Sequence, residues 1–439
     1  MSLTDSLPLS MRYSITGADS INSKTKLHRF DSTSASYNSA SNNKILIPVA
    51  ADSFIDTANS YLYCQITNNA VDADGADKSS FSFNANSIIE KLEIAVSGSS
   101  GKVETIDRYN LFAVSDDLWN SGPAELVHLQ ATAGGNTPSY PESNALGFAL
   151  SEGGAAGNAL TVALKLKGAF LDAYYGKALP QGMPQFTIEI TLADHKNAFV
   201  AAGAASPLTY TVDNVRFYAP CYNILDEGIM SSYAQQLSSS PTMWMGESVG
   251  TIINSIAAAG GKQVSQINAS YRSLNALISI MRSTGDVGVS LNNGISRSTL
   301  NNITEFVYRI KGELFPSDSI EYSTTNVSRA YIENLKAWAH HGEARAKTTA
   351  VSLTQFNKIG TAAGSAGADT DGHGMMSLSL KRFNDERLVN VGMDTSGSSA
   401  PSTLEITFSA SPAANDLTTY AKHDIIFVMQ PNGVIQAAM

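Results

Sequence analysis

The sequence contains little cysteine and no long apolar run. Only two cysteines occur in 439 residues, and Cys64 and Cys221 each lie in an apolar, strand-like stretch. We therefore expect two buried free thiols rather than a disulfide framework or a metal site. No apolar run approaches the roughly 18 residues needed to cross a bilayer, and no charged-then-apolar signal sequence opens the chain. These absences predict a soluble protein made in a reducing compartment.

Charge is also scarce, since 15% of residues are charged and the net charge is −10. Proteins whose main task is to hold phosphate backbones rely on Lys and Arg to displace counterions, so this balance argues against such a function. A weak basic excess occurs only near the start, at Arg12, Lys24, Lys26 and Arg29. We interpret that segment as a solvated arm.

Hydrophobic residues make up 43% of the chain, which is enough for a large core, and the length suggests two or three domains. Apolar and polar residues alternate with the period of a half-buried β-strand in many places. In "TVALKLK", residues 161–167, the alternation places Lys165 and Lys167 on the face opposite Val162 and Leu164. Similar runs occur at residues 61–66, 91–96, 305–311 and 375–381. The pattern predicts antiparallel sheets.

Two strand-like segments, one in each half of the chain, have nearly the same sequence. "FTIEITLA", residues 186–193, is echoed by "LEITFS", residues 404–409. Each copy is followed by a loop and then by a last strand-like run, at 208–220 and 417–433. The same order of two strands at the close of both halves predicts two β-sandwiches of one topology in series, each of about 200 residues.

Helical spacing is confined to a few short stretches. "YNILDEGIMSSYAQQL", residues 222–237, is bracketed by Pro220 and Pro241 and predicts a helix that joins two domains. Two further helices are predicted at residues 107–120 and 328–341, one in each half.

The best catalytic candidate is "GESVG", residues 246–250, which fits the pattern G-x-S-x-G with Ser248 as nucleophile and His423 downstream. That motif needs a buried parallel strand before the serine and a packed helix after it. The preceding "SSSPTMWM" and the period-two alternation of the first 240 residues do not provide this setting. We therefore do not predict an esterase.

Metal motifs are incomplete. "DTDGHG", residues 369–374, resembles the opening of a calcium loop, but the twelfth position is Leu380, where a glutamate is required. His340, His341 and Glu343 have no further histidine within helical reach, so we interpret them as a solvated helix end. The sequence thus predicts no catalytic, cofactor-binding or metal-binding residue.

Several segments resemble a known family, the double jelly-roll major capsid proteins of tailless membrane-containing phages, adenoviruses and large eukaryotic DNA viruses. Residues 213–237 resemble the end of the first barrel and its connecting helix, and 271–283 resemble an early strand of the second barrel. Residues 380–409 are similar to the late strand, Gly-x-x-Thr turn and strand, and 423–435 to the terminal strand with its Asn-Gly turn. The first half of the chain resembles the family only in the pattern and order of its predicted strands.

The resemblance implies an all-β fold of two consecutive eight-stranded jelly rolls with short connecting helices and long loops. It divides the chain into an N-terminal arm at 1–40, a first jelly roll at 41–222, a linker helix at 223–240 and a second jelly roll at 241–439. Two Gly-, Ser-, Ala- and Asn-rich stretches, residues 131–159 and 359–374, read as long surface loops that would form an outward tower.

The implied function is that of a major capsid protein, not an enzyme, and needs no cofactor. Homotrimers would form pseudo-hexameric capsomers that tile an icosahedral shell, so the protein would be made in the host cytoplasm and located in the virion. Expected partners are neighbouring capsomers, minor capsid or penton proteins and, through the arm, an internal membrane; no sequence-specific nucleic-acid binding is expected. The alternative is a carbohydrate-binding or host-attachment β-sandwich protein, which would need an aromatic cluster at a loop end. The three tryptophans, Trp119, Trp244 and Trp338, are instead predicted to pack in cores.

Overall fold

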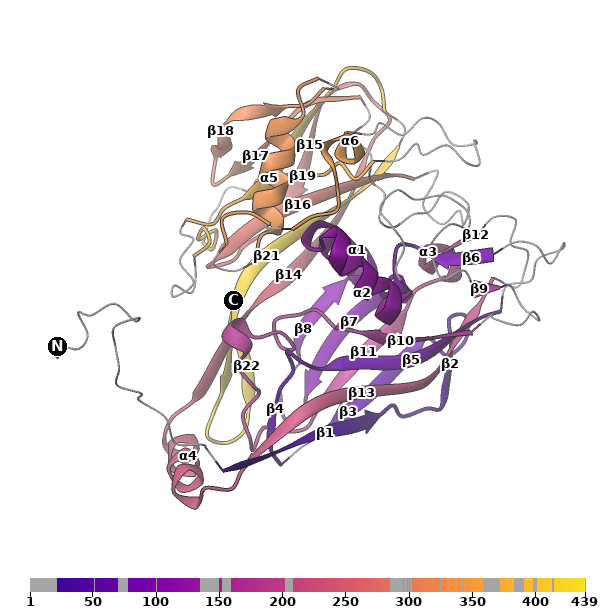
Figure 1. Cartoon of the computed structure of the whole chain (residues 1–439). Coiled ribbons are helices and arrows are strands. Elements are labelled where there is room, and N and C mark those ends of the chain that lie inside the picture. Colours follow the sequence, from indigo (N-terminus) through magenta and orange to yellow (C-terminus); the bar gives the residue numbers. More distant parts are fainter. Residues whose placement is uncertain are drawn as a thin grey trace, which may run out of the picture.

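The structure is a computed structural model of the chain (Figure 1). It describes residues 22–438 except 51, 70–77, 100, 135–149, 152–158, 202–207, 285–294, 296–297, 299, 301, 324, 341–342, 347, 358–371, 383–390, 398–400 and 413. Every strand pairing in it is antiparallel except for one isolated bridge.

The first barrel consists of two facing sheets. One has the order β1 (Ser23–Asp31), β13 (Tyr210–Ile224), β5 (Tyr61–Asn68) and β10 (Ala159–Leu164), with β2 (Ser36–Asn38) and β4 (Phe54–Ile55) paired to β13. The other has the order β3 (Lys44–Val49), β11 (Phe186–Leu192), β7 (Ile89–Val96) and β8 (Lys102–Asp107). A small third sheet is formed by β12 (Phe199–Ala201), β6 (Lys78–Phe81) and β9 (Leu150–Ser151).

The second barrel repeats this arrangement. Its first sheet has the order β14 (Thr242–Ile256), β21 (Asn415–Met429), β16 (Leu274–Ser283) and β19 (Met376–Ser379), with β22 (Ile435–Ala438) added beside β21. Its second sheet has the order β15 (Gly261–Ile267), β20 (Ser402–Phe408), β17 (Ile303–Ile310) and β18 (Glu313–Glu321).

The sequence echo marks equivalent strands. β11 and β20, which carry the two copies, each occupy the second position of a four-stranded sheet, and β13 and β21 occupy the second position of the opposite sheets. Ile188 pairs with Ile94 in the first barrel and Ile406 with Phe306 in the second, and all four side chains are buried in the cores. The prediction of two sandwiches of one topology is confirmed, and each barrel has eight principal strands.

The helices are short and lie outside the barrels. They are α1 (Tyr109–Asn120), α2 (Pro123–Ala133), α3 (His195–Ala198), α4 (Glu227–Ser239), α5 (Ser328–Trp338) and α6 (Leu353–Phe356), with 3-10 turns η3 (Ala85–Ile88) and η4 (Tyr174–Gly176). α1 and α5 confirm the helices predicted at 107–120 and 328–341, although α5 ends three residues early. No helix of the described residues is long and apolar enough to cross a membrane.

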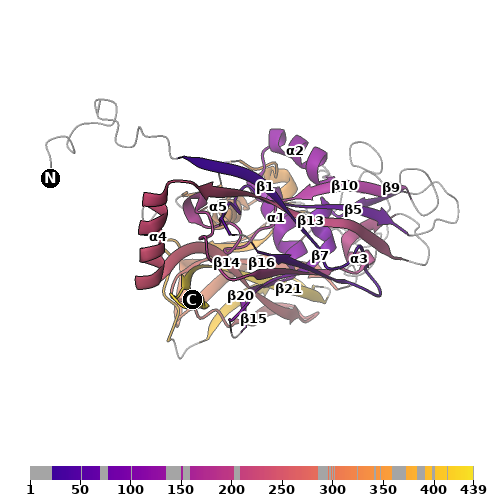
Figure 2. The same cartoon turned by 90° about the horizontal axis from the view of Figure 1, so that it is seen from below.

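The helix α4 lies between the two barrels in the sequence and at one end of the molecule in space (Figure 2). Its first turn is capped by Asp226, whose Oδ1 accepts hydrogen bonds from the backbone N–H groups of Gly228 and Ile229. Such a cap satisfies N–H groups that have no partner within the helix. Tyr233 anchors the helix to the first barrel, because its hydroxyl donates to the carbonyl of Gln181 and its ring packs on Phe54.

Two expectations are corrected. Residues 23–31 and 36–38, assigned to an arm over 1–40, form β1 and β2 and pair with β13, whose edge would otherwise be open. The loop expected over 131–159 begins inside α2, which has Pro123 in its first turn and a Glu125 carboxylate that accepts from the backbone N–H of Gly122. Most of the rest of that loop, and most of the loop at 359–374, lies outside the described residues.

Candidate functional site: the junction between the barrels

The junction is built on two long strands. β14 and β21 each contain 15 residues and pair without interruption from Thr242 opposite Met429 to Ile256 opposite Asn415. One half of this ribbon belongs to the second barrel. The other half extends along the first barrel, and β22 lies beside it there (Figure 1). A single pair of strands therefore takes part in both barrels.

The end of the ribbon where Thr242 pairs with Met429 completes the core of the first barrel. Trp244 of β14 and Phe427 of β21 are buried in the first core, together with Phe170 and Phe186. The ring centroid of Phe170 lies 5.9 Å from that of Trp244, 5.3 Å from that of Phe427 and 5.2 Å from that of Phe186. Edge-on aromatic contacts of this kind add to the free energy of burial.

The exchange also runs in the opposite direction. Side chains of α1, from the first half, belong to the core of the second barrel. Phe112 lies 6.1 Å from Trp338 and 5.5 Å from Tyr420, and Trp119 lies 5.8 Å from Phe356, measured between ring centroids. Each half of the chain thus contributes apolar residues to the core of the other barrel. These shared residues fix the position of one barrel relative to the other. The prediction that all three tryptophans pack in cores is confirmed.

A buried ion cluster lies beside α1. Lys167 Nζ contacts Asp116 Oδ2 and Asp117 Oδ1, both at 2.5 Å. The amides of Asn84 and Asn86 donate to Asp117 Oδ2 at 2.7 and 3.0 Å. Burial opposes ionisation of Asp116, but the nearby positive charges, led by Lys167, outweigh it and lower the pKa of this carboxyl to about 2. The cluster is therefore a paired, hydrogen-bonded network.

The pKa of Asp116 gives the cluster a dependence on pH. As pH falls, the aspartate of the unfolded chain, with its ordinary pKa of 3.8, binds a proton at a higher pH than the folded Asp116 does. The stability that this carboxylate contributes is therefore complete above about pH 4 and is lost as pH falls toward about 2. We expect the free energy of unfolding, measured with urea at about pH 5 and about pH 2, to fall by about 2 kcal/mol more in the wild type than in Asp116→Asn. Equal falls in the two proteins would contradict this assignment.

A second buried carboxylate, Glu104 of β8, connects the first barrel to β14. It accepts hydrogen bonds from the backbone N–H groups of Ala169 and Phe170 at 2.8 and 2.9 Å and from the Ser248 hydroxyl at 2.7 Å. Burial raises the pKa of Glu104, and these hydrogen bonds oppose that rise. Ser248 is therefore a donor that holds a structural carboxylate.

The arrangement around Ser248 does not fit a serine hydrolase. "GESVG" lies in the middle of the antiparallel strand β14, whereas the hydrolase motif places its serine on a sharp turn between a strand and a helix. His423 faces Ser248 in register, but its Nδ1 lies 3.0 Å from the Ala421 carbonyl and its ring stacks on Tyr271. Burial lowers the pKa of His423.

Replacing Ser248 with alanine tests this interpretation. We expect the wild type and Ser248→Ala to hydrolyse a p-nitrophenyl ester equally slowly. We also expect the variant to lose about 1–3 kcal/mol of unfolding free energy, because Glu104 stays buried with one hydrogen bond fewer. Ester turnover that disappears in the variant would instead support the hydrolase.

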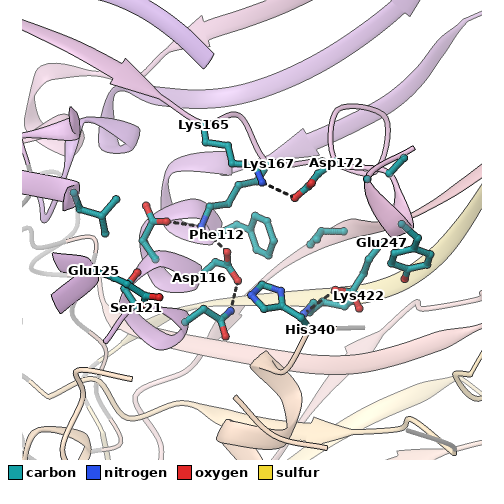
Figure 3. Close-up of a pocket in the computed structure, with 18 residues that line it drawn as sticks. Phe112, Asp116, Ser121, Glu125, Lys165, Lys167, Asp172, Glu247, His340 and Lys422 are labelled. Atoms are coloured by element: carbon teal, nitrogen blue, oxygen red, sulfur yellow. Dashed lines mark hydrogen bonds and ion pairs between the residues drawn. The ribbon is translucent and has the colours of Figure 1, made fainter. Parts of the chain in front are cut away.

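A cavity of about 760 Å³ opens at the junction (Figure 3). It is lined by Asp116, Lys167, Glu247, Lys422 and other polar side chains, and most of its charges are paired. Lys422 Nζ lies 2.8 Å from Glu247 Oε2, and Lys165 Nζ lies 3.2 Å from Asp172 Oδ2. Among the described residues that line the cavity, this pairing leaves no free cluster of one charge that would attract a ligand.

The remaining candidates from the sequence are dispersed. His340 is exposed after α5 and lines the cavity, as expected of a solvated helix end, whereas His341 lies outside the described residues. Asp369 is also outside them. Among the residues that the structure does describe, no group of three His, Cys, Asp or Glu side chains could hold a metal ion. Cys64 and Cys221 are buried free thiols, as predicted.

Comparison with solved structures decides the fold. The PBCV-1 protein VP54, fitted into a reconstruction of the virophage Sputnik, matches with a TM-score of 0.62 at 12% identity over 97% of this chain and 99% of that one. The Faustovirus major capsid protein matches with 0.57 at 9% identity over 97% and 94%, and the mavirus major capsid protein with 0.53 at 10% identity over 99% and 95%. The chain has the double jelly-roll fold. No family model and no curated protein matches the sequence.

The double jelly roll confirms the expected fold class and, at the level of the fold, the resemblance to capsid proteins. The junction itself was not predicted. The alternation in residues 161–167 placed Lys167 on an outer face, but β10 ends at Leu164 and the chain then turns toward α1. Period-two alternation applies only while the chain remains a strand. The ribbon of β14 and β21 was missed because alternation does not reveal which barrel a strand faces.

Proposed function

We propose that the chain is a major capsid protein that assembles into homotrimers. Six jelly rolls, two from each chain, would form a pseudo-hexagonal capsomer that tiles an icosahedral shell. The observation that carries the proposal is the match of the whole chain, both barrels included, to major capsid proteins of Faustovirus and mavirus. Location in the virion, after synthesis in the host cytoplasm, belongs to the same proposal.

The interlocked junction supports a structural role. A block that tiles a shell must hold its two barrels at a fixed angle, because small changes in that angle would accumulate across many copies. Domains joined by a small polar interface move relative to one another by default. Here each core contains side chains from the other half of the chain, and an ion pair between Arg108 and Asp416 joins the two halves. In this proposal the protein is not an enzyme and requires no cofactor.

A glycan-binding protein with the same sandwiches is less well supported. Such a protein would need exposed aromatic side chains at a loop end to bind a sugar ring. Trp119, Trp244 and Trp338 are all buried. The net charge of −10 equally gives no support to a role in binding nucleic acid.

The oligomeric state tests the proposal directly. We expect the purified chain to give a native mass of three copies at micromolar concentration, because capsomer interfaces are large and obligate interfaces persist on dilution. Native mass spectrometry and sedimentation velocity would measure it. A monomer in every buffer and at every concentration tested would overturn the proposal.

The proposed division of the chain follows the strands. An arm precedes β1, the first jelly roll ends with β13, α4 links the barrels, and β14 begins the second jelly roll. The arm would contact neighbouring capsomers or an underlying membrane, and minor capsid or penton proteins would complete the shell. Deleting residues 1–21, which spares β1, should leave the trimer intact and lower the yield of closed particles. A normal yield would count against a role for the arm.

A further inference from the structure

A lysine, an asparagine and a glutamate meet on three consecutive strands of the second barrel. Lys422 lies on the central strand β21, Glu247 on β14 and Asn275 on β16. Lys422 Nζ lies 2.8 Å from Glu247 Oε2, and Asn275 Nδ2 donates to Glu247 Oε1 at 3.1 Å. The two oxygens of one carboxylate therefore contact an amine and an amide nitrogen. Figure 3 shows Lys422 and Glu247 side by side at the junction.

Lys422 and Glu247 lie in the wall of the junction cavity but expose little of their surface. The side chain of Lys422 is 3% exposed and that of Glu247 is 15% exposed, and Asn275 is fully buried. Lysine is almost never buried to this extent, because its flexible stem normally carries the ammonium group to the surface. The ring of Trp338 covers the site, with its centroid 6.0 Å from Nζ. Such low exposure limits the attack of water on an activated amide.

The amide of Asn275 is held by its nitrogen alone. Nδ2 also donates to Asp424 Oδ1 at 2.8 Å, and Asp424 is fixed in turn by the hydroxyls of Tyr174 and Ser273. The carbonyl Oδ1 of Asn275 is buried and has no hydrogen-bond partner. The backbone at Gly392 packs against it so closely that a Cβ there would lie 2.6 Å from Oδ1. A buried carbonyl left unpaired is costly and calls for an explanation.

We propose that Lys422 and Asn275 join in an intramolecular isopeptide bond, with Glu247 as the proton carrier. Glu247 Oε2 takes a proton from Nζ, and the neutral amine attacks Cγ of Asn275. Glu247 Oε1 passes the proton to Nδ2. The Nζ–Cγ bond forms and the Cγ–Nδ2 bond breaks. Nitrogen leaves as ammonium with both protons that Nζ has lost, and Glu247 is again a carboxylate. No oxidant or external reagent is needed.

The reaction uses ordinary catalytic elements. An amine becomes a nucleophile when an adjacent base removes its proton, and fixed neighbours in a folded protein react as if at very high concentration. The bond would tie β16 to β21 and close a covalent loop around much of the second barrel. This inference does not depend on assembly, because it concerns one chain.

The mass of the purified full-length chain tests the proposal. We expect the denatured protein to be about 17 Da lighter than its sequence, the mass of one ammonia. Trypsin should then fail to cleave after Lys422, and peptide 273–282 should be found joined to the peptide that contains Lys422. The full sequence mass together with normal cleavage after Lys422 would overturn the proposal. The wild-type digest is decisive by itself, even if a variant fails to fold.

Variants distinguish formation of the isopeptide bond from other reactions that release ammonia. Lys422→Arg keeps a positive charge beside Glu247 but cannot form the bond, and Glu247→Gln lacks the base, so both should have their full mass. Lys381→Arg is the matched control, because Lys381 is a half-buried lysine near Glu247, and it should still be about 17 Da light. A loss that persists in Lys422→Arg would mean that Asn275 or another asparagine had cyclised on the backbone, and would overturn the proposal.

Discussion

Trp244→Ala is expected to lower the free energy of unfolding by about 3–5 kcal/mol, the range for removing a buried tryptophan. The side chain belongs to a strand of the second barrel, yet it packs against Phe170 and Phe427 in the first core. Urea unfolding followed by circular dichroism would measure this loss.

The neighbouring Met243 provides the control for this prediction. It precedes Trp244 on β14 but points outward, with 55% of its surface exposed. Met243→Ala should change the unfolding free energy by no more than about 0.5 kcal/mol. If Trp244→Ala were as mild as Met243→Ala, the exchange of core residues between the barrels would have no energetic importance.

Replacing Lys167 with methionine should be equally damaging, for an electrostatic reason. Lys167 is the cation in contact with both Asp116 and Asp117, and its side chain is only 17% exposed. Breaking a buried ion pair by removing one partner leaves an uncompensated charge and costs about 3–5 kcal/mol. We expect a loss of that size in urea unfolding near neutral pH. The deficit should shrink in acid, where protonation removes the unpaired charges.

Lys165 is the matched control, two residues earlier. Its pair with Asp172 is half exposed on both sides, and exposed pairs contribute about 0–1 kcal/mol. Lys165→Met should therefore be nearly neutral. Equal effects of the two lysine substitutions, or a Lys167→Met deficit that does not change with pH, would show that the cluster does not act through charge.

The strands and their order could be predicted because burial on one face of a sheet leaves a period of two in the sequence. Ile190 and Ile406, which align in the echo, are buried in the first and the second core. The helix α2 was missed, although Pro123 followed by Glu125 is a recognisable start of a helix.

The junction could not be predicted, because its contacts join residues far apart in the chain. Lys167 and Asp116 are separated by 51 positions, and Ser248 and Glu104 by 144. Nothing local distinguishes a charged residue that will be paired inside from one that will be solvated. The sequence therefore indicates which residues face inward along a strand, but not which of the two cores they enter.

Electron microscopy of the purified protein tests the central claim most directly. Two interlocked jelly rolls in each chain, assembled in threes, should appear in negative stain as compact blocks with a hexagonal outline, some of them joined into sheets or closed shells. Small single particles with the dimensions of one chain, in every condition that permits folding, would contradict the account.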